Sequence, residues 1–196
     1  IGKTILKHTY YNGDSDQFQE LLKFIEPLQW DDPGLNADDW FLDFINGTYG
    51  PFNDALYMKY IDRILSYPLS AERLLQKRLH GNVLFNVYGN ITESIRIYEE
   101  ALLEAKQLGL IEEELTILVE LAIRYGSNRQ YALSKRRYFE ARKLAKALGN
   151  DHYLETILVN MLDGVMTKDD PQFYDLTLEY LTLSRKINSY QGQIQE

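Results

Sequence analysis

The chain repeats part of its own sequence at an offset of 40 residues. When Ser94–Val119 is laid over Ser134–Val159, 13 of the 26 ungapped pairs are identical, whereas average composition would give roughly one or two. The pair Tyr98/Tyr138 is among them. Self-similarity at such a period is typical of repeat proteins, in which each unit buries its apolar face only by stacking on its neighbours.

Capping residues and glycines divide the chain from Ser70 onward into helices joined by short turns. The predicted helices are Ser70 to about Tyr88, Asn90–Gly109, Ile111–Tyr125, Arg129–Leu148, Asn150 or Asp151 to about Met166, and one that starts at Asp170-Pro171. No window alternates apolar and polar residues, so no strand is predicted. The sequence therefore predicts an all-α fold, a right-handed superhelix of antiparallel helix pairs.

Residues 1–69 have a helical pattern without clean repetition, with breaks at Pro27 and at Gly50-Pro51. We expect divergent N-terminal helical hairpins over residues 1–69 and repeats over residues 70–196, joined in one continuous solenoid. Because the chain begins with Ile1 rather than Met, we also expect it to be a piece of a longer protein.

The repeated helices resemble the tetratricopeptide repeat. That family places a small residue, an aromatic and a second small residue on its second helix, and large, large, small and aromatic residues on its first. The matching residues are Ser94, Tyr98, Ala101, then Ser134, Tyr138, Ala141, and on the first helix Leu118, Leu121, Ala122 and Tyr125. In the unit before, the small position falls on Asn82 and the aromatic position on Phe85. Small side chains let helices approach closely, and the ring fills the space beside them.

Long, divergent repeats of this kind are similar to the sensor domains of peptide-responsive transcription regulators of the Rgg, PlcR and Rap type. The resemblance implies a cytoplasmic protein whose repeat domain dimerises and binds a short signalling peptide in a concave groove. Two other classes remain open: a structural module that mediates oligomerisation, and a regulatory domain attached to an enzyme.

In such arrays the first helix of each pair lines the concave surface. Counting from the aligned small and aromatic positions, the candidate peptide-binding residues are Gln76, Leu79, Val83, Asn86, Thr116, Val119, Ile123, Thr156, Val159 and Asp163. They mix apolar and polar groups, as a ligand with both side chains and a backbone requires, and the negative charge of the protein favours an apolar or mildly basic peptide. Packing between neighbouring first helices would explain the same pattern equally well.

The last helix carries a second apolar stripe that one packing partner does not need. Its members Tyr174, Leu178 and Leu181 are candidates for a two-fold homodimer interface, because isologous dimers are the commonest oligomers. Further helices covering this stripe are the alternative.

Composition and motifs point away from chemistry. The net charge is −8 and there is no cysteine, so we expect no direct nucleic-acid binding and no thiolate chemistry. Three separate histidines lack ligand spacing, and no phosphate loop or catalytic triad pattern occurs. We expect no enzyme activity, no cofactor, no metal and no membrane span. Five basic residues of the Arg129–Leu148 helix share one face, which we expect to be solvated: Lys135, Arg136, Arg142, Lys143 and Lys146.

Overall fold

The computed structural model describes Met58, residues 61–62 and residues 65–194, with side chains described as far as Ile187. The chain divides into two units, Ile1–Lys59 and Tyr60–Glu196. Apart from Met58, every described residue belongs to the second unit. The hairpins predicted over residues 1–69 lie almost wholly outside the described residues.

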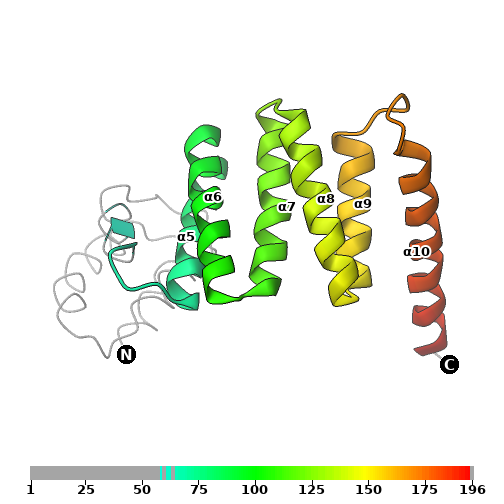
Figure 1. Cartoon of the computed structure of the whole chain (residues 1–196), viewed down its shortest axis with the longest axis horizontal. Helices are drawn as coiled ribbons and strands as arrows, with labels where there is room; N and C mark the ends of the chain where they lie inside the picture. Colours follow the sequence, from blue (N-terminus) through cyan, green and yellow to red (C-terminus); the bar gives the residue numbers. More distant parts are fainter. Residues whose placement is uncertain (1–57, 59–60, 63–64, 195–196) are drawn as a thin grey trace, which may run out of the picture. The chain divides into compact units, whose positions relative to one another are not determined.

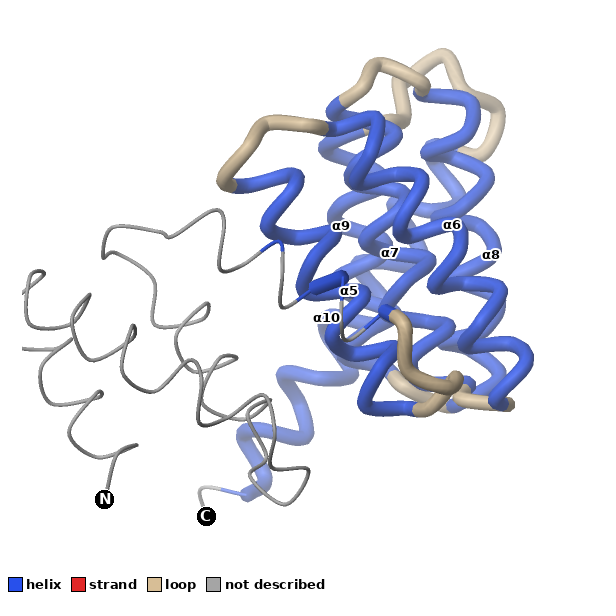
Figure 2. Tube along the Cα trace, turned by 90° about the vertical axis from the view of Figure 1, so that its left-hand side faces the viewer, coloured by secondary structure: helices blue, strands red, loops and turns tan. Residues whose placement is uncertain are grey.

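Every secondary-structure element described in the second unit is a helix and none is a strand, so the all-α prediction is confirmed for this part of the chain. Its helices run in sequence order as a row of antiparallel neighbours (Figure 1). They are α5 (Ala71–Asn86), α6 (Ile91–Leu108), α7 (Ile111–Ser127), α8 (Tyr131–Leu148), α9 (Asp151–Gly164) and α10 (Phe173–Ile194). Seen along the row, the connecting loops gather at the two ends of the helices (Figure 2). The handedness of a superhelix stays a prediction.

Local capping chemistry sets most of the helix boundaries where the sequence predicts them. The Ser70 hydroxyl accepts a hydrogen bond from the Arg73 amide at 3.1 Å, and the Asn90 side chain accepts one from the Glu93 amide at 3.2 Å. At the other end, α6 and α8 stop at Gly109 and Gly149, with φ of 69° and 64°. Residues with a Cβ rarely adopt this left-handed conformation, so glycine ends both helices.

Two predicted helix starts differ from the structure. The helix expected from Arg129 begins at Tyr131, because Arg129 itself has a φ of 59° and belongs to the turn. The last helix begins at Phe173 rather than at Asp170-Pro171. The Asp170 carboxylate instead accepts a hydrogen bond from the Thr167 amide at 2.6 Å and closes a turn, as aspartates commonly do in loops.

The 40-residue offset recurs in the helices. The bounds of α6 and α8 differ by 40 residues, and so do the starts of α7 and α9. Tyr98 and Tyr138 are both buried, and the alanines that follow each by three positions, Ala101 and Ala141, are 0 % exposed. These four side chains belong to one apolar core that extends from α5 to α10.

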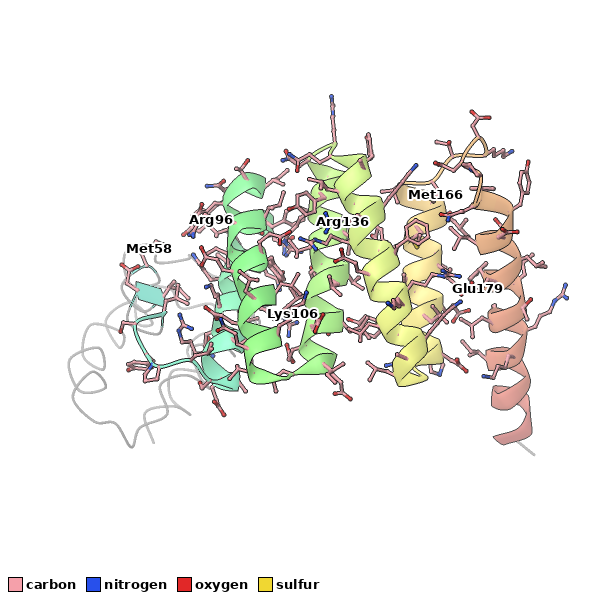
Figure 3. All side chains as sticks on the ribbon, viewed as in Figure 1. Met58, Arg96, Lys106, Arg136, Met166 and Glu179 are labelled. Carbon is pink, nitrogen blue, oxygen red and sulfur yellow. The ribbon has the colours of Figure 1, made fainter. Side chains whose placement is uncertain are left out.

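Ion pairs connect α6 to α8 and α8 to α10. Arg137 of α8 pairs with Glu99 of α6 at 2.8 Å, and Lys146 of α8 pairs with Glu179 of α10 at 2.9 Å. Glu179 is labelled on α10 in Figure 3. Arg142 also pairs with Glu179, and Lys135 pairs with Asp170 at 2.6 Å. The basic face of α8 expected to be solvated is therefore partly engaged by α10 and the loop before it.

Candidate functional site

The ten predicted groove residues do not form one exposed surface. Their exposure falls into three groups: Gln76, Val83 and Val119 are buried, Leu79, Thr116, Ile123 and Val159 are half-buried, and Asn86, Thr156 and Asp163 are exposed. Thr116 also accepts a hydrogen bond from the Tyr153 hydroxyl of α9 at 3.2 Å. Part of the set thus packs neighbouring first helices together, which is the alternative that the pattern left open. Peptide binding by the set stays a prediction.

The register of α5 differs by one residue from the sequence alignment. In the second pair, the Ser134 hydroxyl donates to the carbonyl of Ala122 at 2.6 Å. In the first pair, the matching Ser94 hydroxyl donates at 2.6 Å to the carbonyl of Gly81, not of Asn82. Gly81 is therefore the small residue of α5, and a Cβ there would lie only 2.5 Å from Cδ2 of Tyr98.

This shift changes which residues of α5 face α7. The α5 counterparts of Thr116, Val119 and Ile123 become Leu75, Arg78 and Asn82 rather than Gln76, Leu79 and Val83. The contacts agree, because the Arg78 guanidinium pairs with Glu113 at the start of α7. Asn82 likewise reaches Arg124 of α7.

A buried polar group, which we term the Arg124 cluster, lies where α5, α6 and α7 meet. Its members are Asn82, Ser94, Tyr98, Glu120 and Arg124. Arg124 is 1 % exposed, and its side chain donates from Nε to the Ser94 hydroxyl at 2.8 Å. Its other nitrogens donate to Asn82 Oδ1 and to the Glu120 carboxylate. The Tyr98 hydroxyl also donates to Asn82 Oδ1, at 2.8 Å.

The Arg124 cluster is a structural device rather than an open site. A buried charge is tolerated when it is paired and hydrogen-bonded, and here every partner comes from one of three neighbouring helices. Burial, the largest effect, raises the pKa of Tyr98 to about 12, so its hydroxyl stays a donor even at pH values where an exposed tyrosine begins to ionise.

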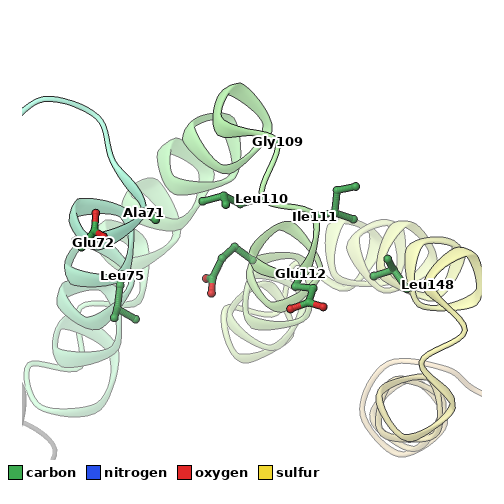
Figure 4. A pocket seen from close by; sticks show the side chains of 9 residues that line it. Ala71, Glu72, Leu75, Gly109, Leu110, Ile111, Glu112 and Leu148 are labelled. Carbon is green, nitrogen blue, oxygen red and sulfur yellow. The ribbon is translucent and has the colours of Figure 1, made fainter.

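A concavity among the described residues lies on the side of the row where α5 and α7 begin and α6 and α8 end. This end groove has a volume of about 690 Å³. Its walls are Ala71, Glu72 and Leu75 of α5, Gly109–Glu113 of the α6–α7 turn and α7, and Leu148 of α8 (Figure 4). The tight turn at Gly109 brings the end of α6 and the start of α7 together.

Three large apolar side chains remain exposed in the end groove. Leu75 and Leu148 are 40 % exposed and Ile111 is 50 % exposed. They come from three different helices, so no single helix pattern identifies them. None of the ten predicted groove residues lines the end groove. The signal that the sequence offers for these three residues is that each is apolar and lies within about one turn of a helix end, where side chains are often exposed to solvent.

Carboxylates surround this apolar floor. Glu113 is compensated by Arg78, but within the described residues Glu72 and Glu112 have no ion-pair partner. Hydrogen bonds from its own backbone amide and from Ser70 lower the pKa of Glu72, so it is ionised at neutral pH. Two helix N-termini and two C-termini meet at this end, so their partial charges roughly cancel. The end groove therefore keeps a net negative charge.

The described residues contain no group of three or more His, Cys, Asp or Glu side chains placed to hold a metal ion. Within the same part of the chain, no helix has the length and apolarity needed to span a membrane.

Comparison of the chain with protein-family models, with curated proteins and with solved structures found no match. The resemblance to tetratricopeptide repeats therefore rests on the residues of this chain.

Proposed function

We propose that this chain is a non-catalytic binding module that takes a short segment of another polypeptide in the end groove, and that the segment combines apolar and cationic side chains. The observation that carries the proposal is the exposure of Leu75, Ile111 and Leu148 beside Glu72 and Glu112, two carboxylates without an ion-pair partner in the described part of the chain.

The apolar floor supplies the attraction. Each Å² of apolar surface removed from water contributes about 25 cal/mol, and concave apolar surfaces are where proteins bind ligands most often. A peptide with leucine-like side chains spaced to reach Leu75, Ile111 and Leu148 would cover all three.

The carboxylates supply the selectivity. Lys and Arg can lay their aliphatic stems along apolar surface while the charged head stays near water, and here that head would meet Glu72 or Glu112. An acidic segment would meet like charge in addition to the −8 charge of the whole chain. The ligand class predicted from the sequence, an apolar or mildly basic peptide, fits this site as well as it fits the predicted set of ten residues.

A peptide sensor of a transcription regulator is the biological role that we propose for such a module. It rests on the tetratricopeptide-like residues and on a binding surface suited to a short peptide. The scaffold and enzyme-regulator alternatives would use the same end groove for a protein segment that is not a free signalling peptide.

Two fluorescent model peptides of equal length test the proposal, one alternating leucine with lysine and the other leucine with glutamate. In anisotropy titrations we expect the lysine peptide alone to bind. Leu75→Gln/Leu148→Gln should weaken this binding at least about tenfold, or about 1.4 kcal/mol.

The control is Leu103→Gln, which changes a leucine of α6 that is 62 % exposed and lies outside the end groove. It should bind like the wild type. Equal binding of both peptides, or equal loss in the groove variant and the control, would show that the end groove is not the site.

A further inference from the structure

One face of α10 carries large apolar side chains that are exposed to solvent. Leu176, Leu183 and Ile187 of α10 pack into the core. On another face, Tyr174 is 69 % exposed, Leu178 66 % and Leu181 45 %. Spacings of four and three residues put these last three side chains in one stripe along the helix, and Arg185, four residues beyond Leu181, extends it.

The charges of α10 are divided between two faces. Glu179 pairs with Arg142 and Lys146 of α8, and Lys186 pairs with Asp151 of α9 at 2.5 Å. Asp175 and Arg185 are exposed and form no ion pair among the described residues. The stripe thus has an acidic residue beside its first member and a basic residue at its other end.

The charges along this stripe are complementary to those of a second copy of α10 that runs in the opposite direction. Consider a second α10 laid antiparallel on the first, with the two-fold axis midway between Leu178 and Leu181. Leu178 then lies level with Leu181 of the second copy, and Tyr174 lies level with its Arg185. Asp175 is about 1.5 Å further along the axis, within reach of the same arginine.

A parallel arrangement lacks this match. It would place Arg185 level with Arg185 of the second copy, where like charges destabilise an association, and it would leave Asp175 with no basic residue of that copy level with it. The charge pattern therefore selects both the occupant, a second copy of this chain, and its direction.

We propose that the chain self-associates through α10, in an antiparallel two-fold contact in which Leu178 packs against Leu181 of the second copy and Arg185 lies between Tyr174 and Asp175 of that copy. Arginine over a tyrosine ring with a carboxylate beside it combines a cation–π contact with an ion pair. One helix face buries less area than a standard interface, so the dimer is expected to be weak and dependent on concentration.

Sedimentation velocity over a concentration series, on the full chain, tests the contact. The wild type should shift from monomer to dimer as its concentration rises through the micromolar range. Asp175→Arg and Arg185→Asp should each weaken the dimer at least about tenfold, because each creates like charges at both ends of the stripe.

The decisive sample is an equimolar mixture of these two variants. Each copy then supplies the charge that the other lacks, so the mixture should dimerise like the wild type although each variant alone is monomeric. The double variant Asp175→Arg/Arg185→Asp should also dimerise. Lys143→Asp, on an exposed position of α8, is the matched charge control and should behave like the wild type.

A wild type that stays monomeric at hundreds of micromolar would overturn the proposal. So would a dimer that both single variants leave intact, because it would use another surface. Circular dichroism of each variant confirms that its helices are retained. The result is independent of peptide binding, since the end groove contains no residue of α10.

Discussion

The guanidinium carbon of Arg124 lies 4.0 Å from the centroid of the Tyr98 ring. The same carbon lies 4.9 Å from the centroid of the Phe85 ring on α5. One cation of α7 is thus held by aromatic faces of α6 and α5 and by hydrogen bonds to the same two helices. This position makes Arg124 a link among three helices.

Arg124→Met should reduce the free energy of unfolding by about 2–4 kcal/mol, because Asn82 and Ser94 lose a charged donor inside the protein. Urea denaturation measures the loss. Arg136→Met is the control, since Arg136 forms an exposed pair with Glu140 and such pairs contribute under about 1 kcal/mol. Equal stability of the two variants would show that the buried link is not stabilising.

Gly81→Ala should destabilise the protein by about 1–3 kcal/mol, although alanine normally favours a helix interior. The added methyl group would enter the space of the Tyr98 ring. At Gly164 nothing lies within 4 Å of the same methyl group, so Gly164→Ala should be neutral or stabilising by up to about 1 kcal/mol. Thermal unfolding of the pair compares them. A stable Gly81→Ala variant would mean that α5 and α6 do not approach closely.

Ala141→Leu should cost about 1–3 kcal/mol by overpacking the close approach of helices at α8, because Ala141 is 0 % exposed. Ala132 of the same helix is exposed, so Ala132→Leu should change the stability by less than about 0.5 kcal/mol. Denaturant midpoints of the two variants check this. Similar midpoints would show that the helices do not approach closely at Ala141.

Stability should fall at alkaline pH. Burial raises the pKa of Tyr98 and of Tyr138 to about 12, from about 10 in an unfolded chain. The neutral phenols are favoured in the folded state, so this contribution is complete below about pH 10 and is lost as the pH rises to about 12. Urea midpoints measured from about pH 8 to about pH 12 follow the loss, and tyrosinate absorbance reports the ionisation.

In Tyr138→Phe the alkaline decline should be shallower, because one of the buried ionisable groups is gone. Tyr131→Phe changes an exposed tyrosine of the same helix and should leave the decline unchanged. A decline of equal steepness in all three proteins would assign it to other groups.

The helix boundaries follow from the sequence because caps act locally. Ser70, Asn90, Gly109 and Gly149 each need only their own turn of chain to act, so their types alone predict helix ends. The difference at Asp170 has the same origin, because an aspartate before a proline can cap a helix or close a turn with equal chemistry.

The candidate site could not be predicted in the same way. The end groove joins Leu75, Ile111 and Leu148 from three helices, and their proximity depends on tertiary packing. The predicted set of ten depended on the register of α5, which only the bond from Ser94 to Gly81 reveals. The stripe of Tyr174, Leu178 and Leu181 was predictable, since it belongs to one helix and needs no partner to be recognised.

In the pair of α5 and α6, Ser94 binds the carbonyl of Gly81, 13 residues earlier; in the pair of α7 and α8, Ser134 binds that of Ala122, 12 residues earlier. The turn at Val87–Asn90 accommodates the additional residue. The longer turn therefore goes with a one-residue shift of α5 against α7, while the serine hydrogen bond that connects the two helices of each pair is the same. The length of the turn in a helical hairpin thus decides which side chains of its first helix face the neighbouring helix and which face solvent. In arrays of this kind, a change in turn length alone can produce a different surface without any substitution in the core.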